Sequence, residues 1–485
     1  MTPRRRVPAL LGTPVALAVV LGLAAVVPGT STAQASTAQA STAQTSTAHG
    51  EGIDSRDAGR KRAVRIARSR GAVVTPAFDV NRRGVGFAVW VDEDNGRYTI
   101  EAARRTSRGR WSEPQQVSRT FPWAGRQKWA WGGRPDVAVD QRGTATVVWS
   151  EPSGGQTRIR TATYAGKKGW SRPRYVSAKG DPASFPDVEV SADGHAVLLW
   201  SGSYPSATGD FTLLTSYRTP RGRWEPPQRL GTDPAWRLAS RPASPAIDDR
   251  GVATLTWDEE HRTELGTGRV QLATRGADSG WVPQTMYSGA NHGHGPRVAT
   301  TPLGQLTFAW KTYDAVLAQH RSPTGAWGSV ETVFTQPGLL PNLLGVGIAD
   351  SGLSAVYVQT VQATGFQVQP LVLVQAAPGA AWSPEAAAEP SLQYYAPAYF
   401  ESFEVGPLGD VSLTWMTQHP EPELWYDTDF RHRLPDGRWL PPVRVGRFAA
   451  DPDLAADGRA NVGVVYGEGR AQHCCNSLEA LLHRP

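Results

Sequence analysis

The hydrophobic pattern of this chain repeats. Eight times, a short polar turn that ends in Gly is followed by an apolar run that closes on an aromatic residue. The turns end at Gly84, Gly143, Gly194, Gly251, Gly304, Gly352, Gly409 and Gly458. In six units a Trp follows the Gly by six residues, at Trp90, Trp149, Trp200, Trp257, Trp310 and Trp415, and the other two units carry Tyr357 and Tyr466. A period of about 50 residues is typical of a repeat architecture.

One unit, residues 135–177, shows the strands inside the period. Residues 136–140 and 158–164 alternate apolar and polar, as half-buried strands do. Residues 144–149 are β-branched and aromatic, and residues 170–176 form a fourth apolar segment. Four short strands per repeat predict one blade of a β-propeller.

A second tryptophan marks the start of the fourth strand. It stands after Gly-x or a close variant in seven units, at Trp111, Trp170, Trp224, Trp281, Trp327, Trp382 and Trp439. Because aromatic rings dominate the cores between stacked sheets, we expect both sets of repeated tryptophans to pack between neighbouring blades.

The two ends of the repeat region predict how the ring closes. The eighth unit ends in residues 478–483 and lacks a fourth strand, whereas residues 63–69 (AVRIARS) precede the first unit and resemble a fourth strand such as 174–177. We therefore predict an all-β, eight-bladed β-propeller over residues 62–485, in which the N-terminal strand completes the last blade and leaves no open sheet edge. Seven blades is the alternative.

The first 61 residues differ in composition from the repeats. Three arginines, Arg4 to Arg6, precede a long apolar stretch and small residues, which is typical of a secretory signal peptide over residues 1–35. A retained membrane anchor is the alternative. Residues 36–61 repeat Ser-Thr-Ala-Gln and read as a low-complexity linker. We expect a secreted, extracellular protein with no membrane span after signal removal.

Charge and cysteine content exclude some classes. Loss of the three signal arginines lowers the formal charge from +6 to +3, which argues against a nucleic-acid partner. The two cysteines, Cys474 and Cys475, are adjacent and can form a vicinal disulfide, remain thiols, or join His473 as a metal-binding fragment. We expect a monomer.

Five of the 18 tryptophans fall outside the repeat positions. They lie in expected connections from a fourth strand to the next first strand, or from a second to a third strand, and both kinds of connection emerge on one face of a propeller. Exposed aromatic rings in such loops stack against sugar rings or other apolar faces. The predicted ligand-binding residues are Trp123, Trp129, Trp131, Trp236, Trp425 and Tyr395, with Tyr394 and Tyr399 beside the last.

Two polar clusters could carry chemistry. Residues 258–261 (DEEH), with His292 and His294, are expected in loops of one blade; Asp258, His261, His292 and His294 are the candidates for a metal site or an acid/base pair. Residues 92–96 (DEDNG) hint at calcium but lack the distant Glu of a complete loop. No other cofactor is indicated.

Three segments carry a resemblance to a known family. RGRWSEPQQVS (108–118), KKGWSRPRYVS (167–177) and DGRWLPPVRVG (436–446) resemble the sialidase-type Asp-box, which joins the third and fourth strands of a propeller blade. The units are also similar to a bacterial secreted repeat of the form VAVDxxGxAxxVW. A sialidase implies an arginine cluster, a Tyr–Glu pair and an acid Asp, but Arg65-Ile66-Ala67 lacks the Pro of the expected Arg-Ile-Pro segment. No catalytic residue is therefore assigned.

Three functions remain open from the sequence. Several irregular aromatics without a recognisable acid/base constellation favour a secreted binding protein for glycans or cell-surface polymers. A carbohydrate-active enzyme, either a sialidase-like glycoside hydrolase or a polysaccharide lyase, is the second hypothesis. A protein-interaction platform is the third, because one fold hosts many functions.

Overall fold

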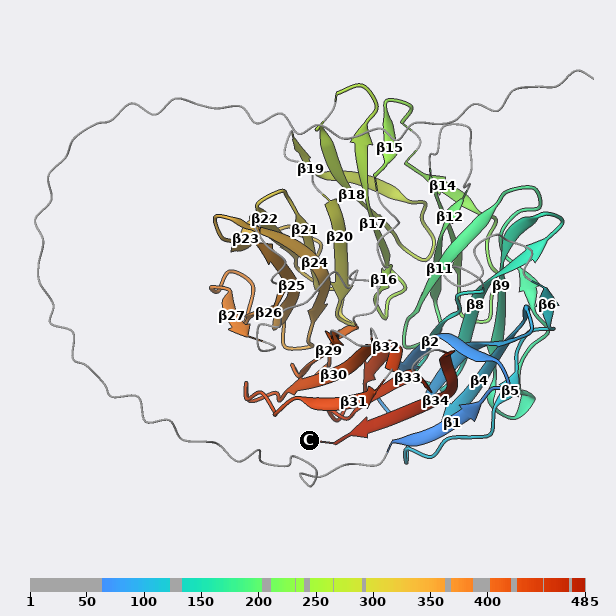
Figure 1. Ribbon diagram of the computed structural model, residues 1–485. Helices are drawn as coiled ribbons and strands as arrows, with labels where there is room; N and C mark the ends of the chain where they lie inside the picture. The colour runs from blue at the N-terminus through green and yellow to red at the C-terminus, as the bar shows by residue number, and fades with distance from the viewer. Residues whose placement is uncertain are drawn as a thin grey trace, which may run out of the picture. The chain divides into compact units, whose positions relative to one another are not determined.

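The structure is a computed structural model. It describes residues 63–122, 133–202, 211–231, 233–239, 245–264, 266–289, 294–362, 368–386, 402–419, 425–447, 449–470 and 473–484. Within the unit Gly59–Pro485, these residues form eight antiparallel sheets that follow one another around a ring, as Figure 1 shows. The predicted eight-bladed, all-β propeller is confirmed.

Each blade runs through four strand positions, from the inner to the outer edge. The first positions are β2 (Ala72–Val80), β7 (Asp136–Val139), β11 (Ala183–Val190), β15 (Trp236–Leu238) with β16 (Ala246–Ile247), β20 (His294–Thr300), β24 (Leu339–Ile348), β28 (Phe403–Val405) and β32 (Ala449–Ala456). The second positions are β3 (Gly86–Asp94), β8 (Ala145–Ser153), β12 (Ala196–Gly202), β17 (Ala253–His261), β21 (Leu306–Lys311), β25 (Ser354–Gln362), β29 (Val411–His419) and β33 (Val462–Arg470).

The third and fourth positions complete the blades. The third positions are β4 (Arg97–Arg105), β9 (Gln156–Tyr164), β13 (Thr212–Arg218), β18 (Gly268–Arg275), β22 (Ala315–Arg321), β26 (Val368–Gln375), β30 (Trp425–Arg433) and β34 (His473–His483). The fourth positions are β5 (Gln115–Gln116) with β6 (Phe121–Pro122), β10 (Arg174–Tyr175), β14 (Gln228–Leu230), β19 (Val282–Gly289), β23 (Glu331–Thr335), β27 (Ser383–Ala386), β31 (Val443–Arg447) and β1 (Val64–Arg68). In the described residues the helical structure is one 3-10 turn, Gly166–Lys168, and no helix there could cross a membrane.

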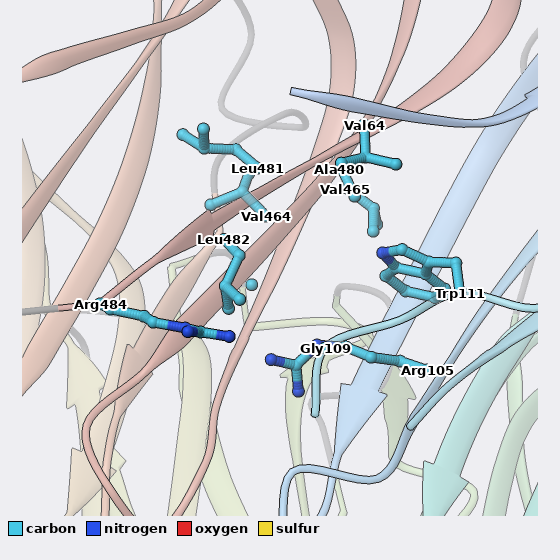
Figure 2. Close-up of a pocket in the computed structure, with 11 residues that line it drawn as sticks. Val64, Arg105, Gly109, Trp111, Val464, Val465, Ala480, Leu481, Leu482 and Arg484 are labelled. Carbon is cyan, nitrogen blue, oxygen red and sulfur yellow. The ribbon is translucent and has the colours of Figure 1, made fainter. Parts of the chain in front are cut away.

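The ring closes as the sequence predicts. Strand β1 pairs antiparallel with β34, so that Val64 faces Ala480 and Arg68 faces Ser477. Figure 1 shows the blue N-terminal strand beside the red C-terminal strands. The seam between this last blade and blade one holds a hollow of about 400 Å³, where the side chains of Arg105 and Arg484 approach each other near Trp111 (Figure 2).

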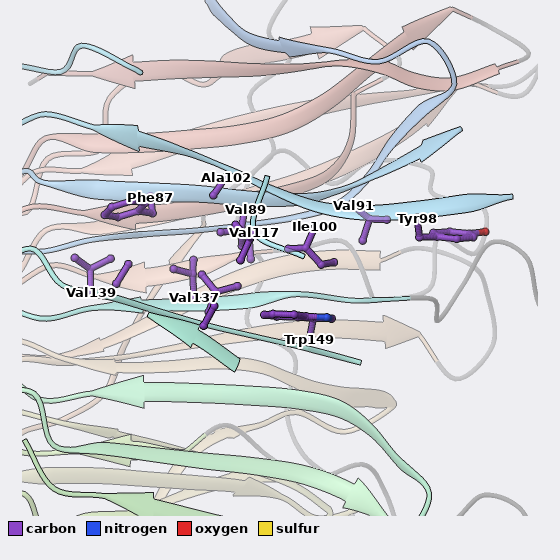
Figure 3. Packing of buried hydrophobic residues seen from close by; sticks show 14 of the residues in the cluster. Phe87, Val89, Val91, Tyr98, Ile100, Ala102, Val117, Val137, Val139 and Trp149 are labelled. Atoms are coloured by element: carbon purple, nitrogen blue, oxygen red, sulfur yellow. The ribbon is translucent and has the colours of Figure 1, made fainter. Parts of the chain in front are cut away.

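The repeated tryptophans form the cores between blades. The six second-strand tryptophans are buried, with Trp149 fully so, and Tyr357 and Tyr466 take the same role in blades six and eight. The seven fourth-strand tryptophans are half-buried and pack against the edges of the same cores. Figure 3 shows one such core, in which Trp149 of blade two meets Val89 and Ile100 of blade one.

The outer strand of blade two is shorter than the sequence predicts. In blade two, Trp170 meets Tyr164 through an isolated bridge, and regular pairing resumes only at Arg174 and Tyr175. Pro173 lies between them and has no N–H to donate, so the ladder is interrupted. The prediction that residues 170–176 form one continuous strand is therefore wrong in its extent.

Candidate functional site

One face of the ring collects the ends of second strands and the beginnings of first strands, because the strands of each blade alternate in direction. We call the part of this face on blades four and five the rim. It comprises β15, the end of β17, the beginning of β20 and the end of β21. Most described members of the predicted site lie here.

Trp236 lies on a strand rather than in a loop. It begins β15, which pairs with the end of β17 so that Trp236 faces His261 and Leu238 faces Glu259. The turn before it is closed by Asp233, whose carboxylate accepts a hydrogen bond from the N–H of Ala235 at 3.0 Å. Buried Leu238 then fixes the strand against the core between blades three and four. The indole is thus carried on ordered backbone.

Two neighbours hold the half-buried indole of Trp236. The guanidinium carbon of Arg269 lies 4.2 Å from the ring centroid, and the imidazole of His261 meets the ring edge-on at 5.0 Å. Arg269 is itself anchored, because its Nε donates to the Glu259 carboxylate at 2.5 Å and its Nη1 lies 3.3 Å from Asp233. Cation–π contact and these ion pairs fix the orientation of the ring before any ligand arrives.

The second feature of the rim is a histidine–carboxylate pair. The Asp258 carboxylate lies 3.2 Å from Nδ1 of His294 and accepts a hydrogen bond from the N–H of Gly295, also at 3.2 Å. The Asp258 side chain is 1% exposed and that of His294 is 35% exposed. A buried carboxylate therefore orients an imidazole that reaches solvent, an arrangement suited to proton transfer.

The structure divides the predicted DEEH cluster. Residues 258–261 continue β17 instead of opening a loop, so their side chains alternate between the two sides of the sheet. His261 points with Trp257 toward blade three and contacts Trp236, whereas Asp258 points toward blade five and contacts His294. His261 and His294 do not share one site. In the described part of the chain, no group of three or more His, Cys, Asp or Glu residues could hold a metal ion.

Two cations lie near Asp258. Burial lowers the pKa of Arg297 and of Lys311, and the charge of Asp258 partly opposes the lowering in both. The Lys311 ammonium donates to the Asn342 side chain at 3.3 Å. The rim thus presents an imidazole and an ammonium beside one buried carboxylate, and Asn342 on β24 of blade six adds an amide next to the ammonium.

Sequence reasoning missed Tyr313. It lies at the tip of the hairpin between β21 and β22, two residues after Lys311, and is 71% exposed. The sequence feature that could have identified it is an aromatic residue at a hairpin tip, where polar residues are usual. Tyr313 adds a second aromatic ring to the rim face.

Several predicted residues are not tested by the structure. Trp123, Trp129, Trp131, Tyr395 and His292 lie outside the described residues. Trp425 begins β30, with its backbone opposite His419, which puts this position at the expected end of blade seven. In the 92–96 segment, the Glu93 carboxylate accepts a hydrogen bond from the N–H of Gly96 at 2.8 Å and so helps to close the hairpin between β3 and β4.

A group of carboxyls on the inner strands was also missed. Asp79, Asp136, Asp187, Glu189, Glu404 and Asp453, from five blades, are close enough to raise one another's pKa values. Burial is the main cause: it raises the pKa of Asp79 to about 6 and that of Glu404 to about 8. In the sequence, each of these carboxyls is one polar residue in the apolar–polar alternation of a first strand. Such a residue is indistinguishable from an ordinary solvent-facing position, so the group was not recognised.

Similarity to known proteins is found among solved structures, at low sequence identity. No family model and no curated protein matches the chain. Among solved structures, the PL25 ulvan lyase bound to -[GlcA(1-4)Rha3S]- has a TM-score of 0.46 and 12% identity, covering 87% of this chain and 98% of its own. The leech intramolecular trans-sialidase has a TM-score of 0.36 and 9% identity, covering 87% and 70%. The GH93 α-L-arabinofuranosidase of Fusarium graminearum has a TM-score of 0.38 and 10% identity, covering 86% and 97%. These neighbours are carbohydrate-active β-propeller enzymes.

Proposed function

We propose that this propeller is a secreted, monomeric glycan-binding protein whose ligand lies across the rim of blades four and five. The observation that carries the proposal is the orientation of Trp236, which Arg269 and His261 hold in place on ordered backbone. A ring that is already fixed loses little conformational entropy when a sugar stacks on it. Exposed Tyr313 supports the same reading from the neighbouring blade.

The polar groups of the rim suit a sugar. Aromatic rings contact the apolar faces of a pyranose, and hydroxyl groups need donors and acceptors at its edge. Lys311 with Asn342, and His294 with Asp258, supply both kinds of group. Because most of these groups belong to strands, the site has little to reorganise on binding.

Acid–base catalysis on the bound glycan is the second candidate function. The pair of buried Asp258 and exposed His294 favours it. When Nδ1 of His294 carries the proton, it donates to Asp258, and Nε2 is the nitrogen that takes or returns a proton during reaction.

A glycan array of the mature protein, followed by calorimetric titration of the best ligand, tests the proposal. Trp236→Ala is expected to weaken binding by about 1–3 kcal/mol, as loss of an aromatic anchor does, and Trp236→Phe by less. The matched control is Trp224→Ala, a half-buried tryptophan of blade three outside the rim. Wild-type affinity in Trp236→Ala would contradict the proposal. Trp129→Ala and Trp425→Ala extend the test to the positions predicted from sequence alone.

The same ligand separates binding from catalysis. If the catalytic candidate is right, His294→Ala should abolish product release, and loss of its contact with the sugar should weaken binding by only about 0.5–1.5 kcal/mol. If the parent protein releases no product from any bound glycan, the catalytic candidate is excluded and the binding function stands. N-terminal sequencing of protein from the culture medium tests export and cleavage near residue 35.

A further inference from the structure

A groove lies between the outer edges of blades one and two, away from the rim. It contains a hollow of about 350 Å³ whose blade-one wall is formed by Arg104, Arg110 and Trp111 with the polar side chains of Thr106, Ser112 and Gln115. Tyr164 contributes the blade-two wall. None of the residues that line this hollow is acidic. We call this feature the outer groove.

Strand register places Arg104 in the groove. In β4, Tyr98, Ile100 and Ala102 belong to the core that blade one shares with blade two. Side chains of a strand alternate between its faces, so Arg104 also points toward blade two. It lies just beyond the end of that apolar core, where the two sheets diverge and the hollow opens.

The facing wall is basic as well. In blade two, Arg160 lies opposite Trp149 and Arg158 opposite Glu151, so both arginines are on the side that faces blade one. Tyr175 pairs with Arg160 and lies on the same side, and its ring contacts both guanidinium groups, with centroid distances of 3.8 Å to Arg158 and 4.2 Å to Arg160. Two arginines and one tyrosine thus form a basic strip on the same side of blade two as Tyr164, nearer to the beginning of β9.

The basic character extends over the outer part of blade two. Between Ser153 and Gly180 the chain has seven basic residues and no acidic one. Five of them are exposed: Lys167, Lys168, Arg172, Arg174 and Lys179. Since the chain as a whole carries a formal charge of only +6, this is a local concentration of positive charge.

Counter-charges are scarce in the outer groove. Glu151 lies 3.3 Å from Arg160, and Arg158 donates to the backbone oxygen of Ser177 at 2.7 Å. By contrast, within the described residues neither Arg104 nor Arg110 forms an ion pair. A guanidinium group without a counter-charge at the wall of the hollow attracts an anion that enters it.

We propose that the outer groove binds an acidic polysaccharide, with the carboxylate or sulfate of one sugar held by Arg104 and Arg110. Guanidinium groups match the geometry of such oxyanions, Trp111 and Tyr164 offer apolar ring surface, and Thr106, Ser112 and Gln115 can pair with sugar hydroxyls. The basic strip of blade two would contact the neighbouring sugars of the same polysaccharide. Nucleic acid fits less well, because two guanidinium groups already contact the Tyr175 ring and a base would have to compete with them to stack on it.

This site is independent of the rim. The outer groove lies where third strands end, at Arg105 in β4 and Tyr164 in β9, which is the opposite face from the ends of the second strands. The two sites share no residue. Binding at one can therefore fail without affecting the other.

The test compares two double variants of equal charge. Arg104→Gln/Arg110→Gln removes the groove cations, whereas Arg221→Gln/Arg223→Gln changes the matching Arg-Gly-Arg-Trp turn of blade three, where Arg223 stands before Trp224 as Arg110 stands before Trp111. Each is titrated with polygalacturonate, neutral dextran and double-stranded DNA at two salt concentrations. Arg110→Gln alone, at an exposed position, replaces the first variant if that variant does not fold.

The expected result is at least about tenfold weaker binding of polygalacturonate by the groove variant, with a flatter salt dependence, and parent-like binding by the blade-three variant and by Trp236→Ala. Neutral dextran should not bind at the groove. The proposal is overturned if the groove variant binds polygalacturonate like the parent, if the blade-three variant loses as much, if Trp236→Ala abolishes the binding, or if DNA binds as tightly as polygalacturonate and is lost in parallel.

Discussion

The Asp79 carboxylate in blade one accepts a hydrogen bond from the backbone N–H of Val139 in blade two at 2.6 Å. The same relationship joins Asp453 of blade eight to Phe78 at 2.7 Å, and Asp136 of blade two to Val188 of blade three at 2.7 Å. Three consecutive seams, from the last blade to the third, are thus held by a first-strand aspartate and a neighbouring backbone donor. Apolar packing alone does not fix the register between blades, and these bonds do.

Asp79→Ala should destabilise the ring by about 1–3 kcal/mol, because it leaves the Val139 N–H buried without its acceptor. Asp79→Asn keeps one acceptor oxygen and should cost less. Urea denaturation at neutral pH measures both. Asp278→Ala, at an exposed turn between β18 and β19, is the control for loss of one negative charge. Equal urea midpoints for Asp79→Ala and Asp278→Ala would refute the role of the bond.

Glu404 should make stability fall as pH rises. Burial, with the charges of Asp79, Asp410 and Asp453, raises its pKa from 4.5 to about 8. The folded protein therefore binds this proton more tightly than the unfolded chain, and the stabilisation is full below pH 4.5 and lost as pH rises to about 8.

Glu404→Gln cannot ionise, so the melting temperature of the variant relative to the parent should increase between about pH 5 and about pH 8.5. Thermal scans in matched buffers measure the difference at each pH. A difference that stays constant across that range would mean that folding does not raise the pKa of Glu404.

Trp149→Ala should behave as a core truncation. The side chain is fully buried between blades one and two, and its removal is expected to cost about 3–5 kcal/mol. Chemical denaturation provides the measurement, and glycan binding by the folded fraction should remain. A loss of binding without a loss of stability would show that the repeated tryptophans have a ligand role instead.

Removal of residues 1–70 should destabilise the whole ring, whereas removal of residues 1–58 should not. The longer truncation deletes β1, exposes the edge of β34, and leaves the buried Glu479 carboxylate without Arg65, whose Nε lies 2.8 Å away. Differential scanning calorimetry and size-exclusion chromatography report melting and aggregation. Identical melting of both truncations would contradict closure through β1.

The fold could be predicted from the sequence because glycine and tryptophan recur at positions that the blade geometry fixes. Gly84 and its equivalents in blades two to seven supply the left-handed turn before the second strand, whereas in blade eight Ala460 and not Gly458 has the positive φ. Trp90 and its equivalents fill the space between sheets. Because the eighth unit lacks a fourth strand, residues 63–69 could be predicted to supply it.

Only part of the rim could be predicted from the sequence. Asp258 to His261 look like a loop because they are polar, yet they continue β17, since β15 on one side and β18 on the other supply backbone partners and Arg237 and Arg269 supply counter-charges. Trp236 was recognised as irregular, but nothing local predicts the additional strand that carries it. Asp258, which contacts His294, and Tyr164, which lines the hollow with Arg104, belong to other blades than the residues they meet. Such contacts leave no trace in a single sequence.

Closure through β1 also constrains how the protein can be made. Arg65 and its partner Glu479 are 414 residues apart, so β1 waits until blade eight has been synthesised before it can pair. Blades one to seven can form in order as the chain emerges, but blade eight is complete only when β1 returns to pair with β34. Throughout that interval β1 is an unpaired strand, and we expect the charges of Arg65 and Arg68 to oppose its pairing with other chains. The ring becomes a single cooperative unit only after β34 has been synthesised.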